Sequence, residues 1–306
     1  MCDLLGTAYV CGEMGSGVRN MTGDIMQKRK MNTYIQMCRA CGFFTGACLL
    51  ATALSAMACK QTNKSGEETC RVAKVTIRTP CDLSIESQIK LLRQWRAGCE
   101  VSEAAVQAYG LQKCFEACAV DSMVAKRMSG LSYKADCPIP LSSLRYLRLL
   151  HYNGNGKPQI GEMVCHQSVA NDLVSIFKQL YEAHYPIERM VLIDNYGADD
   201  ERSMSANNTA CFNYRRVAGS SKLSNHSWGR AVDVNPLYNP YVWHRKDGTL
   251  VVSPAKGRPY ANRQRSFKYK ITTDDLCYRL FRQHGFVWGG AWKHRKDFQH
   301  FEKRVQ

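Results

Sequence analysis

The stretch that decides the fold is Ser224–Asp233, which reads SNHSWGRAVD. Its glycine marks a turn, and the alternating residues that follow predict a strand over Gly229–Asn235. On such a strand Asp233 points to one face while its two neighbours point to the other. His226 lies on the preceding turn and can fold back beside that carboxylate. An imidazole and a carboxylate placed in this way are good ligands for zinc.

A second polar group lies near the C-terminus, in the segment Asp297–Glu302, which reads DFQHFE. His300 would complete a set of three metal ligands with His226 and Asp233. Residues i and i+3 of a regular strand face opposite sides. Asp297 can therefore serve as a general base only if it lies at a bend where the strand begins. An isolated pair of this kind is a weak signal for a metal, so the surrounding motifs carry the prediction.

Three motifs in this order resemble those of the zinc D-alanyl-D-alanine carboxypeptidases of the VanY-like kind, whose relatives include L-alanyl-D-glutamate endopeptidases. They are Ser-x-His-x-x-Gly-x-Ala-x-Asp at 224–233, Trp-Gly-Gly-x-Trp at 288–292 and Asp-x-x-His-Phe at 297–301. The resemblance covers roughly residues 120–306 and includes Leu144–Leu147 and Asn208–Arg215. It implies an α+β fold: a Hedgehog/DD-peptidase-like zinc peptidase domain with a small antiparallel sheet and flanking helices.

The resemblance also implies one zinc ion per chain, held by His226, Asp233 and His300, with Asp297 as the general base. A hydroxide formed on the zinc would then attack the peptide bond at neutral pH. Glu302 is the alternative base.

Five further residues are candidates on the substrate side. Arg215 is the candidate for the oxyanion or a substrate carboxylate, because a planar guanidinium binds carboxylates through two hydrogen bonds. A surface ion pair is the alternative for Arg215, and Arg216 competes with it for the role. Ser224 is expected to contact the substrate or to cap the turn of the first histidine. Trp288 and Trp292 are expected in the substrate site, as pocket walls or as core.

The expected reaction is removal of the terminal residue from D-Ala-D-Ala stem peptides of peptidoglycan. An aspartate base leaves the exact bond open, so an L-alanyl-D-glutamate-type endopeptidase is the first alternative. A non-catalytic zinc domain that binds the cell wall is the second, although such a domain would have no need of Asp297.

The chain is strongly basic, with 42 Lys and Arg against 26 Asp and Glu, a net charge of +16. Residues 241–306 hold 15 basic and 5 acidic side chains. Such a charge favours polyanionic partners. Because the sequence also predicts export, as the next paragraph describes, the expected partners are the anionic polymers of the cell wall. Nucleic acid is not expected, because no pattern of a known nucleic-acid-binding module is present.

Residues 40–58 are uncharged and end in small side chains before Cys59, which predicts an export signal of the lipoprotein type. The mature protein would then lie in the periplasm or cell envelope, anchored by lipid at Cys59, with a transmembrane anchor as the alternative. Met31 is the expected natural start, which would make residues 1–30 an extension.

The predicted domains are an export segment at 1–59, a polar tether at 60–70, a helical extension at 71–130 and the zinc peptidase domain at 131–306. Within the last, we expect helices at 169–184 and 273–282, with Thr273 as a cap, and strands at 144–152, 187–193, 229–235, 286–292 and 298–302. Nine of the 15 cysteines follow Cys59, so an exported chain would keep at least one unpaired thiol.

Overall fold

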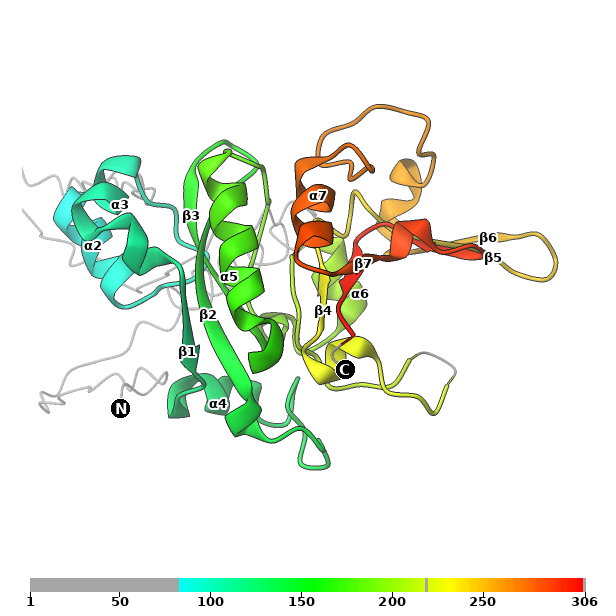
Figure 1. The fold of residues 1–306 in the computed structure, drawn as a ribbon, viewed down its shortest axis with the longest axis horizontal. Helices are drawn as coiled ribbons and strands as arrows, with labels where there is room; N and C mark the ends of the chain where they lie inside the picture. The colour runs from blue at the N-terminus through cyan, green and yellow to red at the C-terminus, as the bar shows by residue number, and fades with distance from the viewer. Residues whose placement is uncertain (1–82, 218–219, 305–306) are drawn as a thin grey trace, which may run out of the picture. The chain divides into compact units, whose positions relative to one another are not determined.

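A computed structural model describes residues 83–217 and 220–304, all of which belong to one compact unit (Figure 1). The predicted export segment with Met31 and Cys59, the tether and the first part of the helical extension lie outside these residues. No helix within the described ranges is long and apolar enough to cross a membrane.

The first sheet is antiparallel and has the order β1-β2-β3, formed by Glu116–Ala119, Leu144–Tyr152 and Pro158–His166. The strand predicted at 144–152 is confirmed at both ends. The third strand was not predicted, because its residues are buried on both faces and show no alternation. Asn153 Oδ1 closes the turn between the two long strands by accepting from Asn155 N at 2.9 Å and Lys157 N at 3.1 Å.

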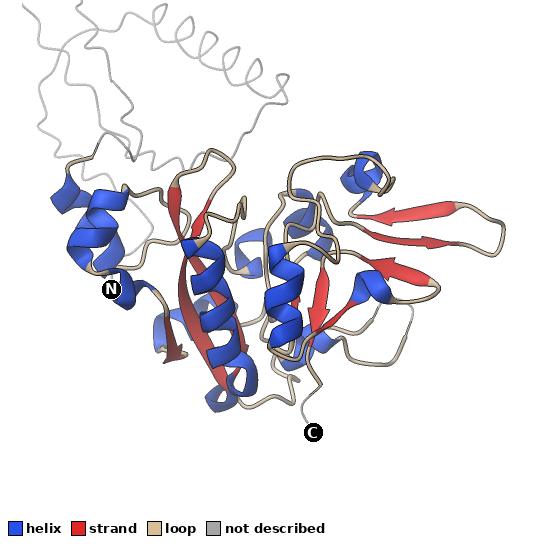
Figure 2. Ribbon diagram, turned by 45° about the horizontal axis from the view of Figure 1, so that its top comes forward, coloured by secondary structure: helices blue, strands red, loops and turns tan. Residues whose placement is uncertain are grey.

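Helix α5 (Gln167–Glu182) follows this sheet and packs on β2. The helix predicted at 169–184 is confirmed, with both ends shifted by two residues. Its apolar stripe faces the core, as the spacing of Val169, Leu173, Ile176, Phe177 and Leu180 predicts. In Figure 2 α5 and α7 (Leu276–Gln283) run side by side, and their rings Phe177 and Phe281 lie 6.2 Å apart.

Three short helices, two before β1 and one between β1 and β2, are each capped by a serine or aspartate side chain. They are α2 (Ile85–Arg93), α3 (Glu103–Tyr109) and α4 (Ser122–Met128). Their apolar residues join the same core as the rest of the chain, and Trp95 Nε1 donates to Gly161 O at 2.9 Å. The domain division at residue 130 stays a prediction.

One predicted strand is wrong, and one predicted helix is present but begins later than expected. Residues 187–193 form no strand, because their backbone groups bond to several separate partners instead of to one neighbouring strand. Ile187 N donates to Tyr152 O, and Val191 N donates to the side chain of Asn208. The helix predicted from Thr273 begins later, because Asp275 Oδ1 accepts from Cys277 N at 2.8 Å and caps it there.

The remaining strands form two small antiparallel sheets. One has the order β4-β9-β7, from Ala231–Asp233, His300–Glu302 and Val287–Trp288. The other has the order β6-β5-β8, from Leu250–Ser253, Tyr241–His244 and Arg295–Asp297, and its β5–β6 hairpin projects away from α7 (Figure 1). The strands predicted at 229–235, 286–292 and 298–302 are present but shorter. The structure also has α6 (Asp200–Ser205) and six 3₁₀ helices, at Leu111–Cys114, Leu141–Ser143, Ile193–Tyr196, Asn225–Trp228, Ala255–Tyr260 and Gly289–Ala291, within the described ranges. Helices with small antiparallel sheets confirm the α+β class.

Candidate metal centre

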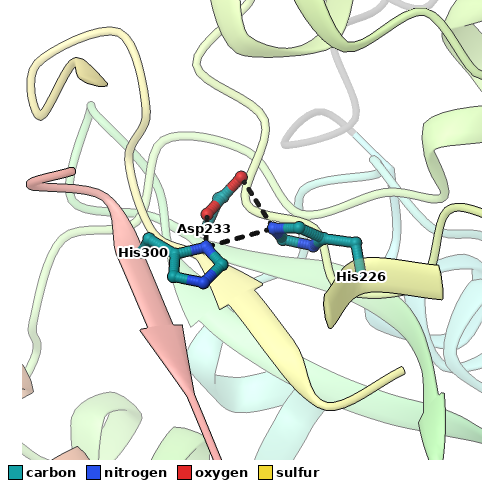
Figure 3. A group of neighbouring side chains, drawn as sticks. All are labelled: His226, Asp233 and His300. Carbon is teal, nitrogen blue, oxygen red and sulfur yellow. Dashed lines mark hydrogen bonds and ion pairs between the residues drawn. The ribbon is translucent and has the colours of Figure 1, made fainter. Parts of the chain in front are cut away.

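Three side chains from separate elements converge at the edge of the second sheet (Figure 3). His226 lies on the 3₁₀ helix Asn225–Trp228, Asp233 ends β4, and His300 begins β9. Asp233 and His300 face each other directly in the β4–β9 ladder. His300 Nδ1 lies 3.0 Å from Asp233 Oδ1, and His226 Nε2 lies 3.2 Å from both Asp233 Oδ2 and His300 Nδ1.

The turn that carries His226 is built by its flanking residues. Ser224 Oγ accepts from His226 N at 3.3 Å and caps the 3₁₀ helix. Gly229 ends that helix with a φ of +63°, a conformation that favours glycine. A Cβ at Gly229 would lie 2.6 Å from His166 N, so a side chain there would push the turn away from the first sheet.

The outer nitrogen of each histidine fixes where its proton lies. His226 Nδ1 is 2.7 Å from Cys211 O, and a carbonyl oxygen only accepts, so Nδ1 carries the proton. His300 Nε2 is 3.1 Å from Glu302 Oε2, which also accepts. In the neutral rings, His226 Nε2 and His300 Nδ1 are therefore left with lone pairs.

When both rings are neutral, as metal binding requires, those two lone pairs and the Asp233 carboxylate point at one another with no donor hydrogen between them. Their separations of 3.0 to 3.2 Å are close to the ~3.3 Å between neighbouring ligands of a tetrahedral zinc with bonds of about 2.0 Å. The ligand atoms of all three residues lie within 4.8 Å of one another. The donor set therefore fits a metal cation.

The ionisation of these groups indicates the same preference for positive charge. Burial by itself would raise the pKa of Asp233, but His226 and His300 hold it well below its usual range. Burial opposes a charged His300, yet its hydrogen bonds to Asp233 and Glu302 raise its pKa to about 10. The surrounding carboxylates thus favour a cation at this position, whether a proton or a metal.

Asp297 lies at the bend that the sequence required, as the last residue of β8 and three residues before His300. Asp297 as a whole is partly exposed, but its Oδ1 atom is buried and has no hydrogen-bond partner in the described part of the chain. Burial raises the pKa of Asp297 to about 7. A carboxylate with that pKa can take up and release a proton near neutral pH.

Glycine and aromatic residues hold this bend against the metal ligands. A Cβ at Gly289 would lie 2.7 Å from Asp297 O and 3.3 Å from His300 Cβ, so only glycine permits the close approach. Trp288 Nε1 donates to Phe298 O at 2.9 Å, and the guanidinium of Arg263 lies 4.4 Å from the Phe298 ring centroid. The bend is therefore fixed from both sides.

Residues 218–303 match the family model described as D-alanyl-D-alanine carboxypeptidase. This segment belongs to that family. It contains the three converging residues and Asp297, which is what the motifs indicated. No curated protein and no solved structure matches the chain.

Arg215 lies just before the carboxypeptidase-family segment and is tied to the site through an acidic partner. Its guanidinium forms an ion pair with Asp200 of α6, and both side chains are 30% exposed. Asp200 lines a pocket together with His226 and Asp233, and it accepts a hydrogen bond from Asn213. Arg216 instead donates to the carbonyl of Ser221, so of the two arginines Arg215 is the one linked to the pocket.

The other predicted substrate residues differ in how they are placed. Ser224 caps the His226 turn, which satisfies one of its two expected roles. Trp288 is 6% exposed and packs against Phe301, so it positions the bend, and its direct contact with substrate stays a prediction. Trp292 is partly exposed, and its ring centroid lies 5.5 Å from that of His300, beside the metal ligands.

Three contributors to the site were not assigned their roles from the sequence. Glu302 was considered only as an alternative base, although its position two residues after His300 on a strand places both side chains on one face. Asp200 and the carbonyl of Cys211 carried no signal, because their contacts depend on distant parts of the chain.

Proposed function

We propose that this chain is a zinc-dependent peptidase that removes the terminal D-alanine from D-Ala-D-Ala stem peptides of peptidoglycan. The observation that carries the proposal is the convergence of the ligand atoms of His226, Asp233 and His300 beside the carboxylate of Asp297. The family match of residues 218–303 supports the reaction class. When bound, zinc would polarise the scissile carbonyl and acidify the attacking water.

The chain's own residues supply the remaining parts of the mechanism. His226, Asp233 and His300 would hold the ion, while Cys211 O and Glu302 orient the two imidazole rings.

Asp297 would take the proton of the attacking water and return it to the leaving amine. The Oδ1 atom of Asp297 is buried and has no hydrogen-bond partner in the described residues, which supports this role. A site that only binds a metal through His226, Asp233 and His300 would need no further carboxylate beside it.

Arg215 is proposed to bind the terminal carboxylate of the substrate or the oxyanion that develops during attack. Asp200 holds the guanidinium at the pocket, which lowers the entropy lost when the substrate binds. Trp292 is proposed as a wall of the substrate site beside His300.

Export of the chain and its lipid anchoring at Cys59 are also proposed. They rest on the sequence, because these residues lie outside the described ranges. The basic residues of 241–306 would hold the peptidase against anionic cell-wall polymers in a salt-sensitive way.

The deciding experiment is digestion of purified pentapeptide muropeptides, with zinc and after chelation, followed by mass spectrometry. Release of free D-alanine that requires zinc is the expected result. Cleavage after L-alanine would make the chain an endopeptidase instead. No cleavage by protein that holds zinc would support a cell-wall-binding domain.

A further inference from the structure

The strand that ends at Asp297 is part of the β6-β5-β8 sheet, in which Asp297 is the one residue with an assigned role so far. β8 pairs with β5 so that Asp297 lies opposite Tyr241, and Arg295 lies opposite Trp243. Directly opposed residues of an antiparallel pair share a face. Tyr241, Trp243 and Arg295 therefore lie on the same face as the proposed base.

These three side chains form a connected group, which we call the aromatic–arginine patch. The rings of Tyr241 and Trp243 have centroids 4.7 Å apart, and Arg295 Nη1 donates to the Tyr241 hydroxyl at 3.3 Å. Both aromatic residues are partly exposed and Arg295 is exposed, so the patch is open to a ligand.

The charge of this region favours an anionic ligand. Arg295 forms no ion pair with any carboxylate in residues 83–217 and 220–304. Lys293 and His294 precede it, and Arg245 and Lys246 lie exposed at the tip of the adjacent hairpin, where Asp247 is the one acidic residue between β5 and β6. An arginine without an acidic partner, held beside two aromatic rings, is suited to bind a carboxylate whose apolar neighbours contact the rings.

The spacing of the patch from Asp297 suggests which part of a substrate it would meet. Residues two apart on a strand lie about 7 Å apart, which is also the length of two residues of an extended peptide. Asp200 lines the pocket beside His226, and Arg215 is ion-paired with Asp200, so the terminal residue is proposed to bind there. The N-terminal part of the substrate would then extend the other way, past Asp297.

We propose that Tyr241, Trp243 and Arg295 form a subsite for a free side carboxylate of the stem peptide, about two residues before the scissile bond. This inference rests on the proposed function and adds a specificity to it. The guanidinium of Arg295 binds the carboxylate, and the two rings pack on the aliphatic part of the same residue.

The test compares two stem pentapeptides that differ only in whether that side carboxylate is free or amidated. The unmodified enzyme should cleave the free form with a kcat/KM about tenfold higher, the effect of one charge-assisted hydrogen bond, mainly through a lower KM. Arg295→Gln should abolish this preference, because kcat/KM for the free form falls to about that for the amidated form.

Lys296→Gln is the matched control, because Lys296 carries the same charge on the same strand but points to the opposite face. It should keep the full preference. An equal loss of preference in both variants would show a general charge effect and overturn the subsite, as would an Arg295→Gln enzyme that still discriminates.

Binding of the two peptides by calorimetry separates this inference from the proposed function. If neither peptide is cleaved by zinc-loaded protein, the proposed function fails, yet tighter binding of the free form that depends on Arg295 still supports the subsite. If both peptides are cleaved and bound equally well by the unmodified enzyme, the subsite fails and the proposed function stands.

Discussion

Glu302 Oε2 lies 3.1 Å from His300 Nε2, while Asp233 Oδ1 lies 3.0 Å from Nδ1 of the same ring. The imidazole is thus held between two carboxylates, one proposed as a metal ligand and one behind it. Glu302 also accepts a hydrogen bond from Asn225, which begins the 3₁₀ helix that carries His226. A single carboxylate therefore ties two of the three proposed ligands together.

Glu302→Ala should weaken zinc binding by about 10–100-fold, because the ring of His300 loses the acceptor that orients it. Competition with a chromophoric chelator measures the affinity. Asn225→Ala is the control, since it removes the other hydrogen bond of Glu302 and leaves the His300 contact in place. Unchanged affinity in Glu302→Ala would show that packing alone orients the ring.

Asp297→Asn should keep the fold and the bound metal but lower turnover by about 10²–10⁴-fold, because an amide cannot accept the proton of the attacking water. Steady-state kinetics on a pentapeptide substrate, together with metal analysis of the same sample, measures both properties. Near-normal turnover would show that Asp297 is not the base.

Zinc should stabilise the folded chain, because the three ligand atoms converge only in the native state. Saturation with free zinc at 100 times its dissociation constant would raise the free energy of unfolding by about 2.7 kcal/mol. Thermal unfolding with and without zinc measures this shift, and chelation should reverse it. His226→Ala should abolish the shift; full zinc occupancy in that variant would contradict the assigned ligand set.

His151 should make the protein less stable in mild acid. It is 2% exposed, its Nδ1 lies 2.7 Å from Ile187 O, and burial lowers its pKa to about 4. The unfolded chain, with a histidine pKa of about 6.5, binds more protons between these two values. Stability is therefore complete above about pH 6.5 and falls by up to about 3 kcal/mol as the pH drops towards 4.

Denaturant unfolding at a series of pH values tests this expectation. His151→Gln, which keeps a donor but does not titrate, should flatten the slope between pH 6.5 and 4. His244→Gln, at an exposed position of β5, is the control and should leave the slope as it is. An unchanged slope in His151→Gln would assign the acid sensitivity to other groups.

Elements with a strong local pattern could be predicted from the sequence. The strand 144–152 and the helix near 169–184 were confirmed, because each buries a regular series of apolar side chains. β3 was missed because burial on both faces removes the alternation that marks a strand. The strand predicted at 187–193 was wrong because Asn208, a side chain distant in sequence, takes the place of a neighbouring strand.

The sequence by itself determined which residues converge on the candidate metal centre, since the order and spacing of the motifs around His226, Asp233 and His300 are specific. It also required a bend at Asp297, because a regular strand would have turned that side chain away from His300.

Only the tertiary structure decided how these residues are supported. The Asp233–His300 pairing, the Arg215–Asp200 ion pair and the pairing of Trp243 with Arg295 join segments that are separated in sequence. Local patterns specify which face a side chain takes within its own strand or helix. Which partner it meets there depends on the register and packing of the whole core, because each of those contacts forms only when the sheets and helices pair across the chain.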